Sequence, residues 1–281
     1  MKNILKGEER VSQYANLGPI LDKINSSTYG DAYSVIAHGG GGTQNEMKYS
    51  HLYTNSLSSI IDSIADGKKL IEIDLAVTAD NEIVGVHSWP ELKAAMNYNG
   101  EGRALLQDDS PLTYEEVRGF EFNPGTRAVN IHEINKLFLE NEDLVLVVDK
   151  IKNIPLLMKM FNYPNRMILE VFNVSSFDLA VQLGVENIVF NINIKEKNIV
   201  DWLVSNKIPA VTFSAHAIDV NKRAYTNAIA IKKLGIVSLA YTSNDDKFIR
   251  NNIGVTISAV YTDFWSLNSK QSITNGENIT Y

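Results

Sequence analysis

The sequence predicts an α/β protein, a (β/α)8 TIM barrel with an insertion after the second strand. Short runs rich in β-branched residues recur eight times along the 281 residues, and several are apolar almost throughout. Segments of helical period separate these runs. Apolar strands linked by helices are typical of parallel sheets that are buried on both faces. Eight such units in one chain favour a closed barrel.

The predicted strands alternate with recognisable helices. The strands are expected at 33–38, 69–77, 144–149, 167–172, 186–193, 208–215, 235–242 and 255–262. Three of the intervening helices, at 56–67, 175–184 and 224–235, each run into a glycine where a helix C-cap would lie. We therefore expect the regular alternation to extend over most of the chain.

One long connection interrupts the alternation. The insertion is expected at about 82–143, and its first residues are typical of a further short strand. Two capping-box patterns, Thr113 with Glu116 and Asn130 with Glu133, predict helix starts within it.

No repeat, low-complexity linker or shift in composition divides the chain. We expect a single barrel over 31–267, preceded by a helical extension at 1–30 that closes the barrel and followed by a C-terminal tail at 268–281.

Composition narrows the possible functions. The chain has 44% apolar residues, a net charge of −7 and no cysteine. Without cysteine, any metal must be held by oxygen or imidazole. An acidic chain is a poor partner for nucleic acid, which needs a basic face. No apolar run reaches the roughly 18 residues of a membrane span, and no signal-peptide core is visible. The expected location is cytoplasmic, or exported if a leader had been removed.

Polar residues gather where the predicted strands end. In a barrel of this kind the reactive residues stand at the carboxyl ends of the strands. The residues in this position are His38, Glu72, Asp74, His87 and Asp149. Taken singly, each is explained as well by an ordinary strand end, with Glu72 or Asp74 pairing with a nearby lysine. Their coincidence at successive strand ends favours a site.

Three of these residues could hold a metal. Residues two apart in a strand point to one face, so Glu72 and Asp74 project together. Paired carboxylates inside a barrel are costly unless something positive compensates them. With Asp149 as a third oxygen donor, a hard divalent cation, Mg2+ or Ca2+, would fit.

Motifs along the chain resemble the glycerophosphodiester phosphodiesterase family of barrels. IAHGGG at 36–41 is similar to the family's I-A-H-R-G opening, and 54–67 to its helix ending in glycine. IEIDLAVTADNEIVGVH at 71–87 gives the strongest match. Weaker similarities follow in LVVDKIK, LAYTSND and SAVYTDF, so the resemblance covers nearly all of 33–265.

The resemblance implies a metal-dependent hydrolase of phosphodiesters that takes part in lipid metabolism. His38 and His87 would be the general acid and base, with Glu72, Asp74 and Asp149 as metal ligands. The substrate would be a small-molecule or lipid-derived phosphodiester, cleaved to a phosphomonoester and an alcohol. In the family a neighbouring substrate hydroxyl attacks first, and water then opens the cyclic phosphate.

The sequence departs from the family pattern around the expected phosphate site. Gly39 replaces an arginine that contacts phosphate, and Ser88 replaces an aspartate. The family's lysine two residues after the third ligand is also displaced, since Lys150 and Lys152 flank that position. Lys150 and Lys152 are both candidates for binding the substrate phosphate. Strand alternation sends them to the face opposite Asp149 unless a bulge intervenes, so the choice between them stays open.

Further candidates have less support. The amides of Gly39 and Gly40 could form a phosphate-binding nest, although a flexible loop explains them equally well. Trp89 could provide an aromatic wall for the substrate alcohol, or simply pack at the rim. Glu170, near the end of the fourth predicted strand, is the reserve metal ligand.

Three functions are consistent with these observations. The first is hydrolysis of a glycerophosphodiester or a similar polyol phosphodiester by two-histidine acid/base chemistry. The second is a phospholipase C/D-like enzyme acting on a phospholipid or a phosphorylated glycan. The third, motivated by Gly39, is a catalytically weak barrel that binds a sugar phosphate.

Overall fold

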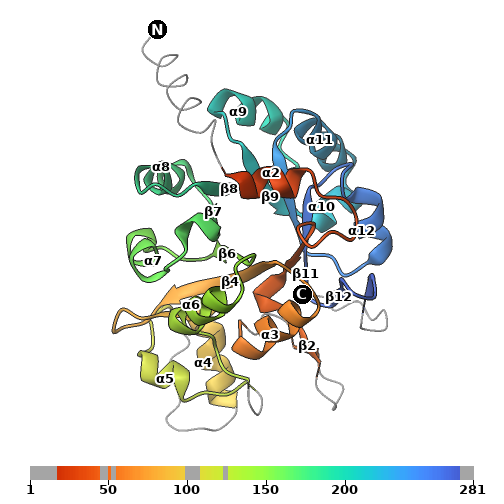
Figure 1. The fold of residues 1–281 in the computed structure, drawn as a ribbon. Helices are drawn as coiled ribbons and strands as arrows, with labels where there is room; N and C mark the ends of the chain where they lie inside the picture. Colours follow the sequence, from red (N-terminus) through yellow and green to blue (C-terminus); the bar gives the residue numbers. More distant parts are fainter. Residues whose placement is uncertain (1–17, 45–49, 52–54, 99–107, 123–125, 273–281) are drawn as a thin grey trace.

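Eight parallel strands close into a barrel, which confirms the predicted fold class (Figure 1). The computed structural model describes residues 18–44, 50–51, 55–98, 108–122 and 126–272. The barrel strands are β1 (Val35–Ala37), β4 (Leu70–Val77), β6 (Val145–Asp149), β7 (Met167–Val171), β8 (Asn187–Asn191), β9 (Ala210–Ser214), β10 (Val237–Tyr241) and β11 (Ala259–Thr262). Strand β1 pairs with both β11 and β4, and this double pairing closes the ring.

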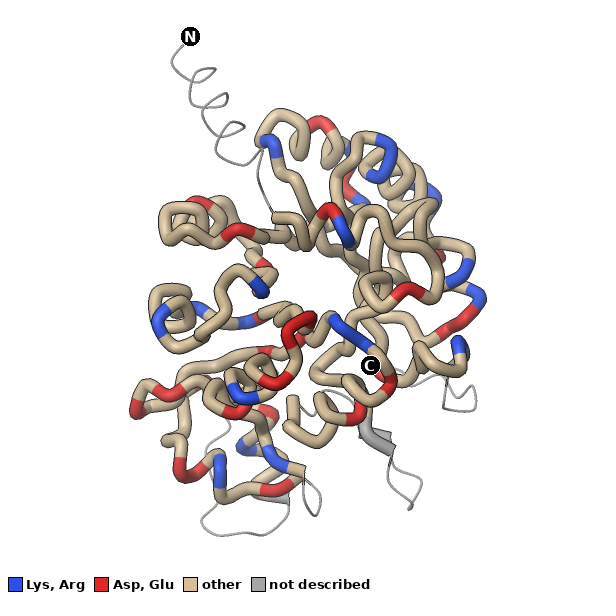
Figure 2. Tube along the Cα trace, in the orientation of Figure 1, with Lys and Arg blue, Asp and Glu red and all other residues tan. Residues whose placement is uncertain are grey.

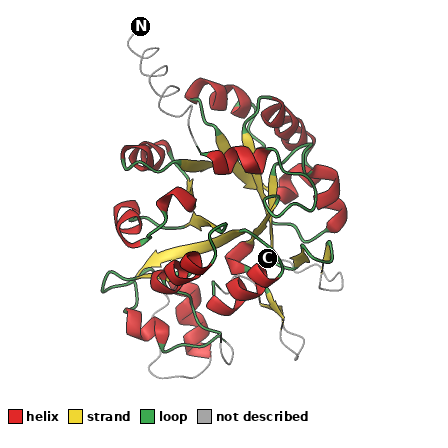
Figure 3. Ribbon diagram, viewed as in Figure 1, coloured by secondary structure: helices red, strands yellow, loops and turns green. Residues whose placement is uncertain are grey.

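Helices form the outer layer around the strands (Figure 3). They are α3 (Leu57–Ala65), α6 (Ile131–Glu140), α7 (Ile154–Met160), α8 (Val174–Gln182), α9 (Ile199–Asn206), α10 (Ala215–Val220), α11 (Lys222–Lys233) and α12 (Asp246–Asn252). The predicted helices at 56–67, 175–184 and 224–235 correspond to α3, α8 and α11, and each ends two residues before its expected glycine. Figure 2 shows acidic and basic residues interspersed over this outer layer.

Strand alternation separates two apolar layers. One side of each strand packs outward against the helices, as Ile71 and Val148 do. The other side fills the barrel interior, where Ile36, Leu70 and Val147 belong to one cluster. Such filling by inward rows makes the barrel a packed core rather than a pore.

Helix α2 (Pro19–Asn25) covers one end of the barrel (Figure 1). Its buried residues Leu21 and Ile24 belong to the same apolar cluster as the inward-facing strand residues. The remainder of the expected extension, 1–17, lies outside the described residues, as does the tail from 273 onward.

The insertion builds a small layer beside β4. Strand β5 (Ile83–Gly85) pairs antiparallel with β4, and it is followed by α4 (Trp89–Tyr98) and α5 (Tyr114–Arg118). This layer has its own apolar cluster, formed by Val84, Val86, Leu92, Leu112, Val117 and Phe120. Helix α6 packs instead on the main core of the barrel. The capping boxes at α5 and α6 are both present, as predicted.

Short elements complete the described chain. They are the 3-10 turns η1 (His38–Gly40) and η2 (Pro164–Arg166), the strand pair β2 (Thr43–Gln44) and β3 (Ser50–His51), and the strand pair β12 (Trp265–Ser266) and β13 (Gln271–Ser272). Within the described ranges, no helix combines the length and apolar composition needed to cross a membrane.

Asp66 joins the end of α3 to the segment that follows the last barrel strand. Its carboxylate accepts hydrogen bonds from Lys68 Nζ at 2.6 Å, from Ser266 Oγ at 2.7 Å and from the Leu267 amide at 2.8 Å. Burial of Asp66 opposes its ionisation, but these donors outweigh that effect and lower its pKa. Residues far apart in the sequence are thereby linked across the outside of the barrel.

We predict that Asp66→Asn lowers the free energy of unfolding at neutral pH by about 1.5–3 kcal/mol, the usual range for hydrogen bonds to a charged group. A lowered carboxylate pKa stabilises the fold above the unfolded value of about 3.9, and this contribution is lost as the pH falls through the folded value. The free energies of unfolding of the two proteins, measured in urea, should therefore differ at neutral pH and become equal in acid. The exposed Asp62 on the same helix gives the control Asp62→Asn, and equal losses in both variants would contradict the assignment.

Candidate functional site

Along each barrel strand, the side chains that point into the barrel change from apolar to polar near the carboxyl end of the strand. Two residues after each inward apolar residue, a polar one follows: Glu72 follows Leu70, for example, and Asp149 follows Val147. Each strand contributes one residue to this polar layer, which comprises His38, Glu72, Asp149, Glu170, Asn191, Thr212, Tyr241 and Tyr261. The apolar interior of the barrel is therefore followed by a polar layer at the carboxyl ends of the strands.

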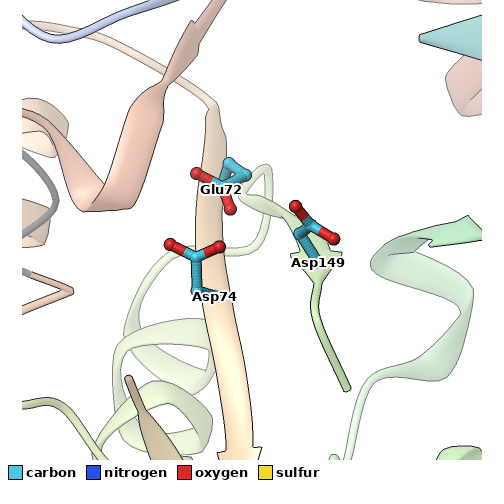
Figure 4. Close-up of side chains that lie close together, drawn as sticks. All are labelled: Glu72, Asp74 and Asp149. Atoms are coloured by element: carbon cyan, nitrogen blue, oxygen red, sulfur yellow. The ribbon is translucent and has the colours of Figure 1, made fainter. Parts of the chain in front are cut away.

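Three carboxylates lie close together at this polar layer. Glu72 and Asp74 lie two apart on β4, and the register of the β4–β6 pair sets Asp149 beside Asp74. One oxygen of each can be chosen so that all three lie within 4.8 Å of one another (Figure 4). The structure thus brings together the three residues that the sequence suggested as metal ligands.

Burial and mutual repulsion make this cluster unstable without positive charge. Glu72 and Asp74 are each 2% exposed. Burial and the charge of Asp74 raise the pKa of Glu72 well above its usual range. Burial also raises the pKa of Asp149, even though Lys150 opposes the rise. Oxygen donors in this arrangement suit a hard divalent cation, whose charge would offset the repulsion.

Neighbouring donors hold Glu72 and Asp74 in place. The amide of Gly39 donates to Glu72 Oε2 at 2.7 Å. Asn55 Nδ2 donates to Asp74 Oδ2 at 3.1 Å, and the same Asn55 accepts from the Asp74 amide. Oriented ligands of this kind are typical of metal sites. Asn55 was not predicted, because its contact joins the segment before α3 to β4 and leaves no periodic pattern.

His38 is buried beside the cluster and is positioned by a second carboxylate system. Its Nδ1 lies 3.0 Å from Asp263 Oδ1 and 3.3 Å from Thr242 Oγ1. Asn244 Nδ2 donates to the other oxygen of Asp263 at 3.2 Å. A carboxylate on Nδ1 fixes the ring and directs Nε2 to exchange protons with a ligand. Asp263 directly follows the last barrel strand, so the strand-end rule that selected His38 could also have found it.

His87 approaches the same cavity from the insertion. It follows β5, its side chain is 31% exposed, and its Nδ1 lies 2.6 Å from Glu91 Oε2 on α4. Both histidines line a cavity of about 210 Å³ together with all three carboxylates. The remaining described lining residues are Lys150, Glu170, Phe172, Asn191, Tyr241 and Tyr261.

Glu170, the reserve ligand, is held by hydrogen bonds. Its Oε1 accepts from Asn191 at 2.7 Å and from Thr212 at 2.8 Å, and Tyr261 donates to Oε2 at 3.2 Å. Burial and the charge of Asp149 raise the pKa of Glu170 to about 7. Among the described residues, the clustered carboxylates are Glu72, Asp74 and Asp149, without Glu170.

The side chain of Lys150 lies on the cavity side, because the strand ends at the preceding residue. Strand alternation alone would send this side chain away from Asp149, but Lys150 has φ 63° and lines the carboxylate cavity. The strand ends at Asp149, and the left-handed residue turns the chain so that Lys150 Nζ lies 3.6 Å from Asp149 Oδ2. Burial opposes protonation, yet Asp149 outweighs it and raises the pKa of Lys150. Lys152 lines a second, adjoining cavity instead.

The structure also places the glycine loop and Trp89. The Gly39 amide donates to Glu72, so it orients that carboxylate. Gly40 has φ 81°, and a Cβ there would lie 2.6 Å from Ser59 Oγ, so this position requires glycine for close packing on α3. Trp89 packs partly on the apolar cluster of the insertion and also lines the second cavity.

Comparison with known proteins points to one family. A model of the glycerophosphoryl diester phosphodiesterase family matches residues 38–267. The glycerophosphodiester phosphodiesterase of Thermotoga maritima has a similar structure, with TM-score 0.56 and 17% identity over 84% of this chain and 96% of that one. A Parabacteroides distasonis glycerophosphoryl diester phosphodiesterase gives TM-score 0.61 and 15% identity over 92% and 95%.

A third structure carries a ligand. A phosphodiesterase of Oleispira antarctica, solved with the product sn-glycerol-3-phosphate, gives TM-score 0.59 and 18% identity over 83% of this chain and 95% of that one. At these identities the structural likenesses show the fold. No curated protein matches the chain.

We predict that Mg2+ or Ca2+ raises the unfolding temperature, and by more at about pH 8 than at about pH 5.5, because a cation needs ionised ligands. Raised pKa values keep protons on Glu72 and Asp149 to higher pH. The fold without cation therefore loses stability as the pH rises through these values, and the cation restores it. Scanning fluorimetry across pH measures both effects.

Asp149→Asn should abolish the increase in unfolding temperature, whereas Glu142→Gln, at an exposed position, should preserve it. A shift independent of pH would contradict the prediction.

Proposed function

Because the chain belongs to the glycerophosphoryl diester phosphodiesterase family, whose members are phosphodiester hydrolases, we propose that it hydrolyses a glycerophosphodiester or a similar polyol phosphodiester to a phosphomonoester and an alcohol. The observation that carries the proposal is the cavity in which two histidines face a cluster of three carboxylates. The product bound to the Oleispira antarctica protein is a glycerol phosphate, which supports the same substrate class.

A divalent cation, Mg2+ or Ca2+, fits the donor set of the site. Glu72, Asp74 and Asp149 would hold it, since they are clustered, two of them are buried, and their charges repel one another. When bound, the cation would offset the charge that develops on the non-bridging phosphate oxygens in the transition state. Lys150 adds a fixed positive charge at the same cavity. This lysine compensates for the family arginine that is replaced by Gly39, but only as a point charge.

The two histidines have different surroundings that suit opposite roles. His38 is buried and its Nδ1 faces Asp263, so Nε2 can take the proton from the attacking hydroxyl while Asp263 stabilises the imidazolium. His87 is more exposed and lies at the boundary with the second cavity, so it would protonate the leaving alcohol. If the substrate's own hydroxyl attacks, the resulting cyclic phosphate is opened by water, with the two histidines exchanging roles.

This set of groups favours an enzyme over a binding barrel. A protein that only bound a sugar phosphate would have no use for a buried histidine oriented by a carboxylate beside a carboxylate cluster. Here that histidine, its Asp263 partner and a second histidine all belong to one site.

We expect His38→Ala and His87→Ala each to lower kcat by about 10²–10⁴-fold, the usual contribution of general acid–base catalysis. Hydrolysis of glycerophosphodiesters with Mg2+ or Ca2+ should be followed by release of the alcohol, with and without excess EDTA. Full activity in EDTA would eliminate the metal role. Turnover that survives both substitutions would eliminate the histidine roles.

Asp263→Asn is expected to lower kcat by about 10²-fold or more, because the histidine loses the charge that orients and stabilises it. KM and the unfolding temperature should change little, since Asn keeps the shape of the side chain. Asp245→Asn is the matched control, because Asp245 caps α12 and Asn can also cap a helix. A parallel fall in stability and kcat would indicate a merely structural role for Asp263.

A further inference from the structure

A second cavity adjoins the first and shares two of its residues. It has a volume of about 420 Å³, twice that of the carboxylate cavity. His87 and Lys150 line both cavities, while Lys152, Trp89, Asp109 and Asn153 line only the second. A volume of this size can hold a small organic group. The two cavities are therefore neighbours, with His87 and Lys150 at their boundary.

The charges of the two cavities are opposite. The inner cavity contains Glu72, Asp74, Asp149 and Glu170. Among the described residues of the outer cavity, Lys150, Lys152 and Asp109 carry charge, and Lys150 also lies beside Asp149 of the inner cavity. The outer cavity therefore has a positive balance although the whole chain has a net charge of −7. A cationic head group would meet two like charges there, whereas an anionic group would meet two opposite ones.

The walls of the outer cavity are partly apolar. Leu75 and Val86 contribute to them, and Trp89 adds an aromatic side chain. Apolar walls with a few placed polar groups are typical of small-molecule sites, where the walls contact carbon atoms and the polar groups set orientation. A short polyol chain that ends in an anion matches this combination.

We propose that the outer cavity is the leaving-group subsite, and that it selects alcohols that carry a second anionic group, such as a phosphate. This inference rests on the proposed function, because His87 at the boundary is the residue that would protonate the departing oxygen. Lys152 would contact the second anion, Lys150 would lie between the two phosphates, and Trp89 would pack against the carbon chain. The enzyme would then prefer diesters with a phosphate on each side of the leaving alcohol.

The test uses three diesters that share a glycerol 3-phosphate half and differ in the leaving alcohol. These alcohols are glycerol phosphate, glycerol and choline, which are anionic, neutral and cationic. The full chain, assayed with Mg2+ or Ca2+, should give the highest kcat/KM with the anionic alcohol. Lys152→Ala should lower the anionic-to-choline ratio by about 3- to 10-fold, because one exposed charge is lost that attracts the anion and repels choline, and added salt should weaken the preference. Lys152→Glu should lower the ratio further.

Lys159→Ala is the control, because Lys159 is an exposed lysine on α7 and lines neither cavity. It should leave the ratio unchanged. A preference for choline, or a ratio that does not respond to Lys152, would overturn the subsite. Melting curves of the Lys152 variants would reveal any loss of folding.

Binding separates failure of the subsite from failure of the proposed function. The affinities for the anionic and choline diesters can be measured without turnover by calorimetric titration into the His38→Ala variant with Ca2+ present. The same titrations into the variant that also carries Lys152→Glu show whether the preference depends on Lys152. If binding prefers the anionic diester and this preference depends on Lys152, the subsite is supported. If the natural chain then hydrolyses neither diester, the proposed function is refuted. Hydrolysis without Lys152-dependent preference would refute the subsite alone, and loss of both would refute both.

Discussion

The electrostatic cost of three clustered carboxylates is the constraint on which the site depends. Glu72 and Asp74 are buried, Asp149 is partly buried beside them, and the three charges repel one another. Isolated buried charges are strongly unfavourable, so a fold retains them only when other groups compensate. The Gly39 amide, Asn55 and the Lys150 ammonium all supply part of that compensation. A cation would supply the rest, and the binding of an anionic diester would then follow from the same balance of charge.

The barrel makes this unfavourable arrangement possible. The inner apolar cluster and the outer helix-packed cluster supply the stability of the fold, and the polar layer lies above them. Parallel pairing of β4 with β6 sets the carboxylates side by side through backbone hydrogen bonds, which do not depend on side-chain charge. Stability and chemistry therefore occupy different levels of the same strands, as is usual for barrels of this class.

Much of this organisation could be predicted from the sequence, because it follows strand period. Alternation places Glu72 with Asp74, and the strand-end rule selects His38 and Asp149. Alternation alone could not orient Lys150, because alternation holds only while the strand continues, and one left-handed residue ends the strand.

Partners far apart in the sequence were harder to foresee. Asp263 meets His38 across 225 positions, and Asn55 meets Asp74 across a helix. Ring closure brings Asp263 to His38, and the path of the chain around α3 brings Asn55 to Asp74. The strand-end rule can select Asp263 itself, but no local pattern records which residue it contacts. Asn191 and Tyr241, by contrast, obey the same two-residue step from apolar to polar, so a stricter use of that step could have found them.

The two histidines are anchored in different parts of the molecule, and this separates two properties of the site. His38 is held by Asp263 at the end of the last barrel strand, within the rigid ring. His87 follows β5 and contacts Glu91 on α4, so its setting belongs to the insertion. Changes in the length or composition of that insertion can therefore reshape the surroundings of the departing alcohol while the carboxylate cluster and His38 stay as they are. Substrate range can diversify in such a protein without rebuilding its reaction centre.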